Sequence, residues 1–117
     1  MEYHLLSDLL LVKLLRVEDE LAFQEIYRRY WEPLYENARR KIHRDDEAEG
    51  LVQDVFMSIW EKRTTQEIDN LGGYLTNALK YRIIDHYRTQ TLAERYREYE
   101  LAKSIEDAPS PEEESDF

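Results

Sequence analysis

Basic and aromatic side chains alternate along the segment from residue 80 to residue 99. The interleaved residues are Lys80, Tyr81, Arg82, His86, Tyr87, Arg88, Arg95, Tyr96, Arg97 and Tyr99. Unpaired nucleic-acid bases stack on aromatic rings, while lysine and arginine bind phosphates. The segment is therefore a candidate nucleic-acid-binding surface. An amphipathic helix with half-buried tyrosines and charged edges would have the same composition, so composition alone leaves both interpretations open.

Acidic residues cluster between positions 45 and 49. Asp45, Asp46 and Glu47 are consecutive, and Glu49 follows them. Such a cluster could bind a cation, but it is also typical of the solvated start of a helix, where the helix dipole favours acids. A third interpretation is a surface that faces a basic protein partner. The polar side of the same predicted helix continues with Gln53, Asp54 and Met57.

Residue patterns that are typical of catalytic sites are absent from the sequence. There is no cysteine, which removes disulfides, thiolate zinc sites and cysteine nucleophiles. None of the three histidines lies three residues after a glutamate, so the Glu-x-x-His pairs of di-metal helical bundles are missing. No phosphate-binding glycine loop or nucleophile elbow occurs. The sequence therefore predicts a protein that is not an enzyme and that uses no cofactor or metal.

The spacing of the hydrophobic residues predicts an all-α bundle of about four helices. Only three Gly and three Pro occur in 117 residues, which favours long helices. The predicted N-caps are Ser7, Asp19, Asp45 or Asp46, and Asn70. Pro33 lies inside the second predicted helix, where it removes a backbone hydrogen bond. We therefore expect a kink near Arg29 or a break after Trp31.

Apolar stripes at helical spacing give the predicted core. The second helix contributes Leu21, Phe23, Ile26 or Tyr27, Tyr30, Leu34, Ala38 and Ile42. The third contributes Ala48, Leu51, Val52, Val55, Phe56, Ile59 and Trp60, and the fourth contributes Leu71, Leu75, Leu79 and Ile83. We expect one helical domain over residues 1–103. Residues 104–117 are rich in Ser, Pro, Glu and Asp and predict a disordered acidic tail.

Charge is segregated along the chain, whose net charge is −10. Residues 28–44 carry +4 and residues 71–103 carry +2, while residues 1–27, 45–70 and 104–117 carry −4, −6 and −6. Different segments could therefore meet partners of different charge. No apolar run approaches the roughly 20 residues that span a bilayer, and the N-terminal stretch lacks the features of a signal peptide. These features, with the absence of cysteine, predict a cytoplasmic protein.

Three motifs together carry a family resemblance. They are AFQEIYRRYWEPLYENARRKI, DDEAEGLVQDVFMSIWEKR and IDNLGGYLTNALKYRIIDHYR. Their order and spacing resemble the second conserved region of the extracytoplasmic-function sigma factors of bacterial RNA polymerase, over about residues 7–90. The form LKYRIIDHYR resembles a subgroup that is often paired with membrane-bound anti-sigma proteins in outer-membrane nutrient uptake. The resemblance therefore implies an anti-sigma partner as well as a polymerase.

The resemblance implies a polymerase-binding segment at residues 46–60. In the family, this segment docks on the clamp helices of the largest subunit of core RNA polymerase. Gln53 and Asp54 match the family's contact residues by position. The full candidate set for polymerase binding is Asp46, Glu49, Gln53, Asp54 and Met57. The family usually has Asp at the position of Gly50, so one expected acidic contact is missing here.

The resemblance also implies a promoter-opening helix at residues 71–88. In the family, this part opens the minus-ten promoter element and holds a flipped-out base of the non-template strand. The candidate DNA-binding residues are Lys62, Arg63, Asn77, Lys80, Tyr81 and Arg88. The family often has Asn where this chain has Tyr81, so the details of base reading do not carry over to that position.

The expected function is that of a non-enzymatic transcription initiation module that binds core RNA polymerase and recognises and melts the minus-ten element. The family's other half is a C-terminal helix-turn-helix domain that reads the minus-thirty-five element. Because the residues after Ser104 could not form that half, we expect the chain to be one domain of a two-domain factor. The alternative is an acidic helical protein-interaction adaptor without DNA binding. An adaptor would not need the basic and aromatic face of the fourth helix.

Overall fold

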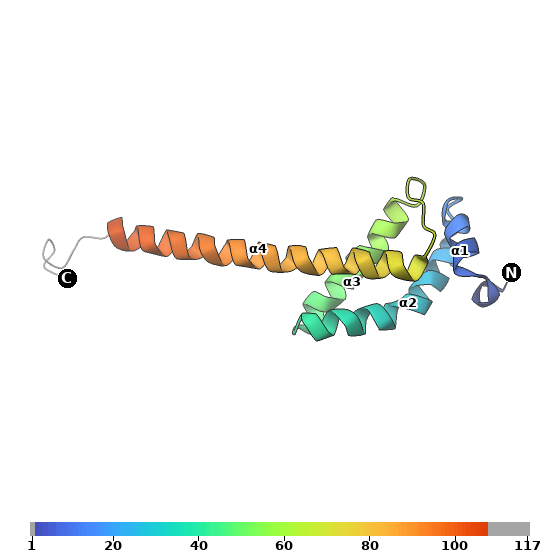
Figure 1. The fold of residues 1–117 in the computed structure, drawn as a ribbon, viewed down its shortest axis with the longest axis horizontal. Helices are drawn as coiled ribbons and strands as arrows, with labels where there is room; N and C mark the ends of the chain where they lie inside the picture. The colour runs from blue at the N-terminus through green and yellow to red at the C-terminus, as the bar shows by residue number, and fades with distance from the viewer. Residues whose placement is uncertain (1, 108–117) are drawn as a thin grey trace, which may run out of the picture. The chain divides into compact units, whose positions relative to one another are not determined.

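The computed structural model describes residues 2–107, and these residues form helices joined by short loops (Figure 1). The elements are a 3-10 helix η1 (Tyr3–Leu5) and the α-helices α1 (Asp8–Leu15), α2 (Glu20–Lys41), α3 (Asp45–Glu61) and α4 (Leu71–Asp107). The prediction of an all-α fold with about four main helices is confirmed. Residues 104–107 are the last residues of α4, and the rest of the predicted acidic tail, residues 108–117, lies outside the described residues.

The chain divides into two compact units, residues 1–84 and residues 85–117. The first unit contains η1, α1, α2, α3 and the start of α4 as far as Ile84. The described part of the second unit is the remainder of α4, from Asp85 to Asp107. The division falls inside the predicted domain 1–103, so each unit is treated separately below.

The first unit has one hydrophobic core, and the predicted stripes of α3 and α4 supply much of it. Its buried residues are Leu11, Val12, Leu15, Ala22, Ile26, Leu34, Ala38, Ile42, Ala48, Val52, Val55, Phe56, Ile59, Ile68, Leu71, Leu75, Leu79 and Ile83. The predicted stripe of α2 is wrong at its first position, because Leu21 is 54% exposed and Ala22 is buried instead. Ala22 lies one helical turn before the buried Ile26, which places both on the core face.

Aromatic rings fill the space between α2 and α3. Tyr27 of α2 packs on Phe56 of α3, with their ring centroids 4.7 Å apart. Phe23 meets the edge of Trp60 at 5.4 Å. Edge and tilted contacts of this kind add to the free energy gained by burial of the rings. They fix α3 against α2, so the outward face of α3 has a defined position in the first unit.

Three of the four predicted N-caps are confirmed. Ser7 Oγ accepts a hydrogen bond from the backbone N–H of Leu10, and Asp19 Oδ1 accepts from two backbone N–H groups at the start of α2. Asn70 Oδ1 accepts from the N–H of Gly73 at 2.9 Å, and this fixes where α4 begins. These caps satisfy backbone donors that have no partner within the helix.

The predicted cap of α3 at Asp45 or Asp46 is wrong. Arg44 occupies the N-cap position, and its side chain makes no capping hydrogen bond. Asp45, Asp46 and Glu47 instead form the first turn of α3. Three carboxylates in the first turn stabilise the positive end of the helix dipole. One of them, Asp46, also accepts a hydrogen bond through Oδ1 from the backbone N–H of Glu47 at 2.9 Å.

The break of α2 predicted after Trp31, as the alternative to a kink near Arg29, does not occur. The helix continues through Pro33 from Glu20 to Lys41. Proline removes only one backbone donor, and the residues after it are fixed by burial of Leu34 and Ala38 in the core. Packing of the apolar face therefore outweighs the missing hydrogen bond.

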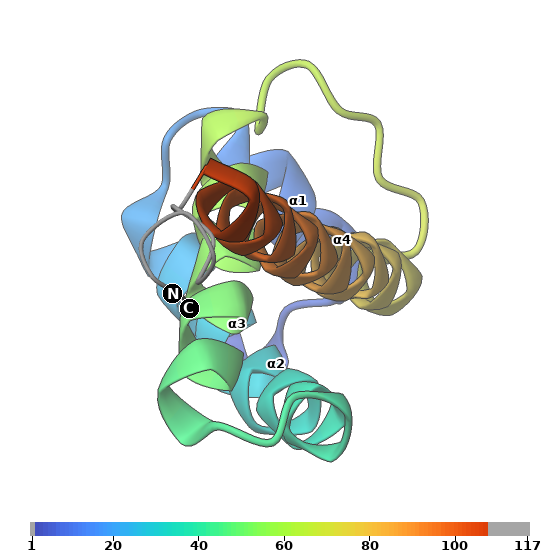
Figure 2. The same cartoon turned by 90° about the vertical axis from the view of Figure 1, so that its left-hand side faces the viewer.

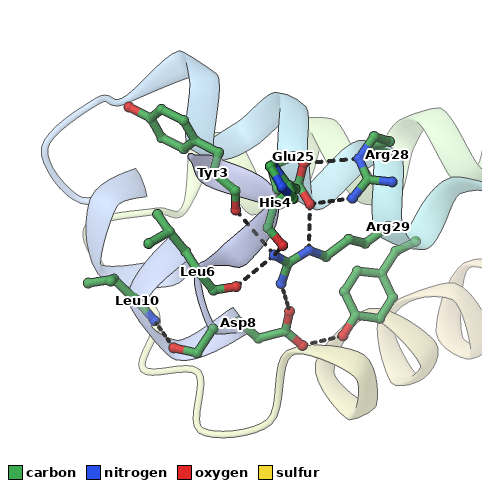
Figure 3. Close-up of polar contacts among 10 residues, drawn as sticks. Tyr3, His4, Leu6, Asp8, Leu10, Glu25, Arg28 and Arg29 are labelled. Atoms are coloured by element: carbon green, nitrogen blue, oxygen red, sulfur yellow. Dashed lines mark hydrogen bonds and ion pairs between the residues drawn. The ribbon is translucent and has the colours of Figure 1, made fainter. Parts of the chain in front are cut away.

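Arg29 of α2 ties the N-terminal segment to the rest of the first unit (Figure 3). Its guanidinium donates to Asp8 Oδ1 at 2.8 Å, to Glu25 Oε2 at 2.7 Å and to the carbonyl oxygen of Leu6 at 2.6 Å. Tyr30 donates its hydroxyl hydrogen to the second carboxylate oxygen of Asp8. One arginine thus gathers η1, α1 and α2 around a single charged group.

Glu25 is the buried acid of this arrangement, with 7% of its side chain exposed. Hydrogen bonds from Arg28 and Arg29 lower the pKa of Glu25 to about 2. Burial, with the hydrogen bond to Asp8, raises the pKa of the Tyr30 hydroxyl to about 12. The charged carboxylate and the neutral phenol are therefore the forms that the fold stabilises at neutral pH.

Candidate binding surfaces

The five residues predicted for polymerase binding share one exposed face of α3. They are Asp46, Glu49, Gln53, Asp54 and Met57, and all are exposed. Their spacing places them opposite the buried face that contains Val52, Val55 and Ile59. The structure therefore brings together the whole predicted set, and we call these five residues the α3 face.

Two acids of the α3 face have basic neighbours. Asp46 lies 3.4 Å from Arg44, and the hydrogen bond from Arg44 lowers the pKa of Asp46. Asp54 lies 3.9 Å from Arg82 of α4, with 60% of the Asp54 side chain exposed. Exposed ion pairs of this kind contribute little to stability, so a partner can compete for both carboxylates at small cost.

Met57 borders a groove between α2 and α3. The groove has a volume of about 230 Å³ and is lined by Glu20, Phe23, Gln24, Met57 and Trp60. Met57 is 56% exposed, although it is a large apolar residue. The sequence interpretation missed the contribution of α2 to this surface. The sequence signal for this groove was Met57, a large apolar residue on the polar side of α3, three residues before Trp60.

Three of the residues predicted for DNA binding share the exposed face of α4 within the first unit. Asn77, Lys80 and Tyr81 are exposed, and Tyr81 is 63% exposed. They lie opposite Leu75 and Leu79, which are fully buried. A cation, an amide and an aromatic ring on one face can bind a phosphate, pair with a base edge and stack on a base.

The other cations predicted for DNA binding lie elsewhere. Lys62 is exposed at the C-cap of α3. Figure 2 shows the loop that runs from the end of α3 to the start of α4. Arg88 belongs to the second unit, is exposed, and lies 3.8 Å from Asp85. Ile68 is buried and anchors the loop that separates Lys62 from α4.

Arg63 points inward, unlike its neighbour Lys62. Its guanidinium donates to the carbonyl oxygen of Trp60 at 2.8 Å and to Glu18 Oε1 at 3.1 Å, and it lies 4.4 Å from the centre of the Trp60 ring. Only 20% of the side chain is exposed. The buried Nε has no hydrogen-bond acceptor among the described residues. In this conformation Arg63 links the end of α3 to the turn before α2.

Glu18, the partner of Arg63, has a left-handed backbone conformation with a φ of 62°. A non-glycine residue in this region costs on the order of 1 kcal/mol. The conformation lets the chain turn sharply between α1 and α2. The ion pair with Arg63 joins this turn to the C-terminal end of α3.

The described residues, 2–107, contain neither a metal-binding cluster nor a membrane-spanning helix. Within this range there is no group of three or more His, Cys, Asp or Glu side chains that could hold a metal ion. None of the described helices combines the length and the apolar character that a membrane span requires. In the acidic first turn of α3, Asp45 pairs with Arg39 and Asp46 pairs with Arg44.

Comparison with known protein families identifies a match that covers both candidate surfaces. The family model described as Sigma-70 region 2 matches residues 26–93, which is more than half of the chain. The matched range begins within α2, includes all of α3 and continues into α4. Comparisons with curated proteins and with solved structures found no match.

Proposed function

Because the chain belongs to the Sigma-70 region 2 family, we propose that it binds core RNA polymerase through α3 and opens the minus-ten promoter element with α4. As a member of this family, the chain has the role of a sigma factor in transcription initiation. The family's region 2 domain is a non-enzymatic module. The order of the three sequence motifs further supports the extracytoplasmic-function subtype.

The α3 face is the proposed contact with polymerase. It presents three carboxylates, one amide and one methionine on a helix whose opposite side is buried. A basic partner surface would gain charge complementarity with the acids. Met57 and the groove beside it would supply an apolar anchor at the C-terminal end of this face. Gln53 and Asp54 lie at its centre, in agreement with the roles that the resemblance implies for them.

The proposed DNA contact is the exposed face of α4 at Asn77, Lys80 and Tyr81. Single-stranded DNA offers an unstacked base to Tyr81 and phosphates to Lys80. In duplex DNA the base is paired and stacked, so Tyr81 would bind it more readily in a strand that has already separated. Lys62 and Arg88 are proposed as further phosphate contacts. We assign Arg63 a smaller role because its guanidinium is engaged with Glu18 and Trp60.

The observation that carries the proposal is the match over residues 26–93, which contain both exposed faces. The proposal is tested with the chain bound to purified core RNA polymerase. We expect the complex to bind the non-template strand of a minus-ten element more tightly than the same sequence as duplex. Equal affinity for the strand and the duplex would contradict a role in base capture. Polymerase binding without any DNA contact would favour the adaptor alternative.

A further inference from the structure

The described part of the second unit exposes large apolar and aromatic side chains along α4. The exposed fractions are 64% for Leu92, 64% for Tyr96, 62% for Tyr99, 63% for Leu101 and 67% for Ile105. Exposing this much apolar surface on one helix is costly unless a partner covers it. The charges on the helix indicate which partner that is.

Helical spacing divides these residues between two faces of different charge. One face, which we call the tyrosine strip, has its residues three or four positions apart. The tyrosine strip consists of Arg88, Leu92, Arg95, Tyr96, Tyr99 and Lys103, all of them exposed. The opposite face contains Glu94, Arg97, Glu98, Leu101 and Ile105. The strip has three cations, whereas the opposite face has two acids and one cation.

The tyrosine strip is basic even though Asp85 lies at its start. Asp85 is 3.8 Å from Arg88, and both side chains are at least 73% exposed, so the pair leaves the Arg88 guanidinium accessible. Arg95 lies further along the strip, and Lys103 lies near its end, where Glu106 follows three residues later in the sequence. By helical spacing, the three cations of this face outnumber its two acids, Asp85 and Glu106. A second copy of the chain on this face would bring the cations of the two copies together, and like charges across an interface are unfavourable. This argues against self-association. An anionic partner gains from the same charges.

The tyrosines identify the class of anionic partner. Tyr96 and Tyr99 lie between the cations, and aromatic rings flanked by Arg and Lys suit unstacked bases joined by phosphates. From Arg88 to Lys103 the strip is about 22 Å long at the rise of an α-helix. This length allows contact with several nucleotides of one strand. A protein surface rich in acids would use the cations but would leave the rings without planar partners.

We propose that the tyrosine strip is a further binding site for single-stranded nucleic acid, beyond the residues assigned to the minus-ten element. The new contacts are Arg95, Tyr96, Tyr99 and Lys103. The inference rests on the proposed function, because it assigns further single-strand contacts to the second unit. It assigns binding without a base sequence, since stacking and phosphate contacts are tolerant of sequence.

The test measures binding of the full chain to a labelled oligodeoxythymidylate by fluorescence anisotropy over a series of salt concentrations. In the double variant Arg95→Ala and Lys103→Ala, the fall of log affinity with log salt should become less steep, by about 1.4. Each single-strand phosphate contact contributes about 0.7 to the steepness of this plot. The matched control is Arg97→Ala, which removes a cation from the opposite face and should leave the slope unchanged. Equal effects of Arg95→Ala and Arg97→Ala would overturn the proposal.

The stacking role is tested with Tyr96→Ala and Tyr99→Ala in one variant. We expect about a tenfold loss of affinity with little change in the salt slope, because stacking releases no counterions. Leu101→Ala, on the opposite face, is the control and should bind as the wild type does. No binding by the wild-type chain at the lowest salt would contradict the proposal. A dimer in sedimentation that the tyrosine variant dissociates, with unchanged DNA binding, would assign the strip to a second copy.

Failure of this inference is distinguishable from failure of the proposed function. Lys80→Ala is measured against the oligodeoxythymidylate and, with polymerase present, against the minus-ten strand. If only Lys80→Ala lowers binding, the tyrosine strip is not a site and the proposed function stands. If only the Arg95 and Lys103 variant lowers binding, the strip stands and the role of α4 in the first unit is wrong.

Discussion

At the scale of single residues, Glu25 shows how charge holds the N-terminal segment in place. Its carboxylate is 7% exposed and is bonded to both Arg28 and Arg29. Arg29 then reaches Asp8 and the carbonyl oxygens of the first residues (Figure 3). An unpaired charge at this position would be costly, so the cluster depends on the acid being ionised.

The low pKa of Glu25 gives a prediction about pH and stability. Its pKa is about 2 in the fold and has an ordinary value of 4.5 in the unfolded chain. The unfolded state therefore binds a proton first as the pH falls, and the stabilisation present above pH 4.5 is lost between about 4.5 and 2. Glu25→Gln should flatten this part of the stability curve, measured by urea unfolding at each pH. The exposed Glu32→Gln is the control, and an equal flattening by it would contradict the assignment.

Lys80 and Tyr81 are neighbours with different predicted roles in binding the non-template strand. In the complex with polymerase, Lys80→Ala should make the fall of log affinity with log salt less steep by about 0.7, the value for one single-strand phosphate contact. Tyr81→Ala should weaken binding by about 1–3 kcal/mol with little change in slope, because it removes a stacking surface. The measurement is a salt titration of strand binding for both variants. Identical slopes for the two variants would show that the charge and stacking roles are misassigned.

The sequence predicts the α3 face better than it predicts individual cations. The polar positions of α3 follow from the apolar stripe on the other side of the helix, so periodicity alone places all five residues together. The inward position of Arg63 depends on Glu18, which is distant in sequence and has an unusual backbone conformation. No local pattern indicates such a contact, which is why Lys62 and Arg63 are indistinguishable before the fold is known.

At the scale of helices, local chemistry determines where most elements begin. Ser7, Asp19 and Asn70 cap α1, α2 and α4 through hydrogen bonds to nearby backbone groups, and such contacts are predictable from sequence. The start of α3 and the passage of α2 through Pro33 depend instead on packing and on the helix dipole. At the first of these positions the expected cap is wrong, and at the second the expected break does not occur.

The cap at Asn70 gives a prediction for α4. Asn70→Ala removes the acceptor of the Gly73 N–H bond, which should lower the free energy of unfolding by about 1 kcal/mol. Asn70→Asp keeps an acceptor at the same place and should retain most of the stability. Both are measured by urea denaturation, with the exposed Thr76→Ala as a control inside the helix. If Asn70→Ala and Asn70→Asp are equally stable, the side chain does not cap α4.

At the scale of the whole molecule, the two units have different proposed binding roles. The first unit holds the α3 face and the exposed residues of α4 at Asn77, Lys80 and Tyr81. The second unit adds the tyrosine strip, which begins at Arg88. The charge segregation seen in the sequence fits this division, because acids gather on α3 and the cations of α4 lie among tyrosines. The family match extends through residue 93 and so includes residues of both units.

The most direct test of the central claim is the affinity of the chain for purified core RNA polymerase. We expect the wild-type chain to bind, and Asp54→Arg to weaken binding by about 1–3 kcal/mol through loss of a charge contact and added repulsion. Asp54 is exposed and its pair with Arg82 is weak, so the variant should keep its helical circular dichroism. Glu36→Arg, on the exposed side of α2, is the matched charge reversal and should bind as the wild type does. A folded Asp54→Arg variant with wild-type affinity would contradict the role of the α3 face, and a wild-type chain that does not bind the polymerase would contradict the account as a whole.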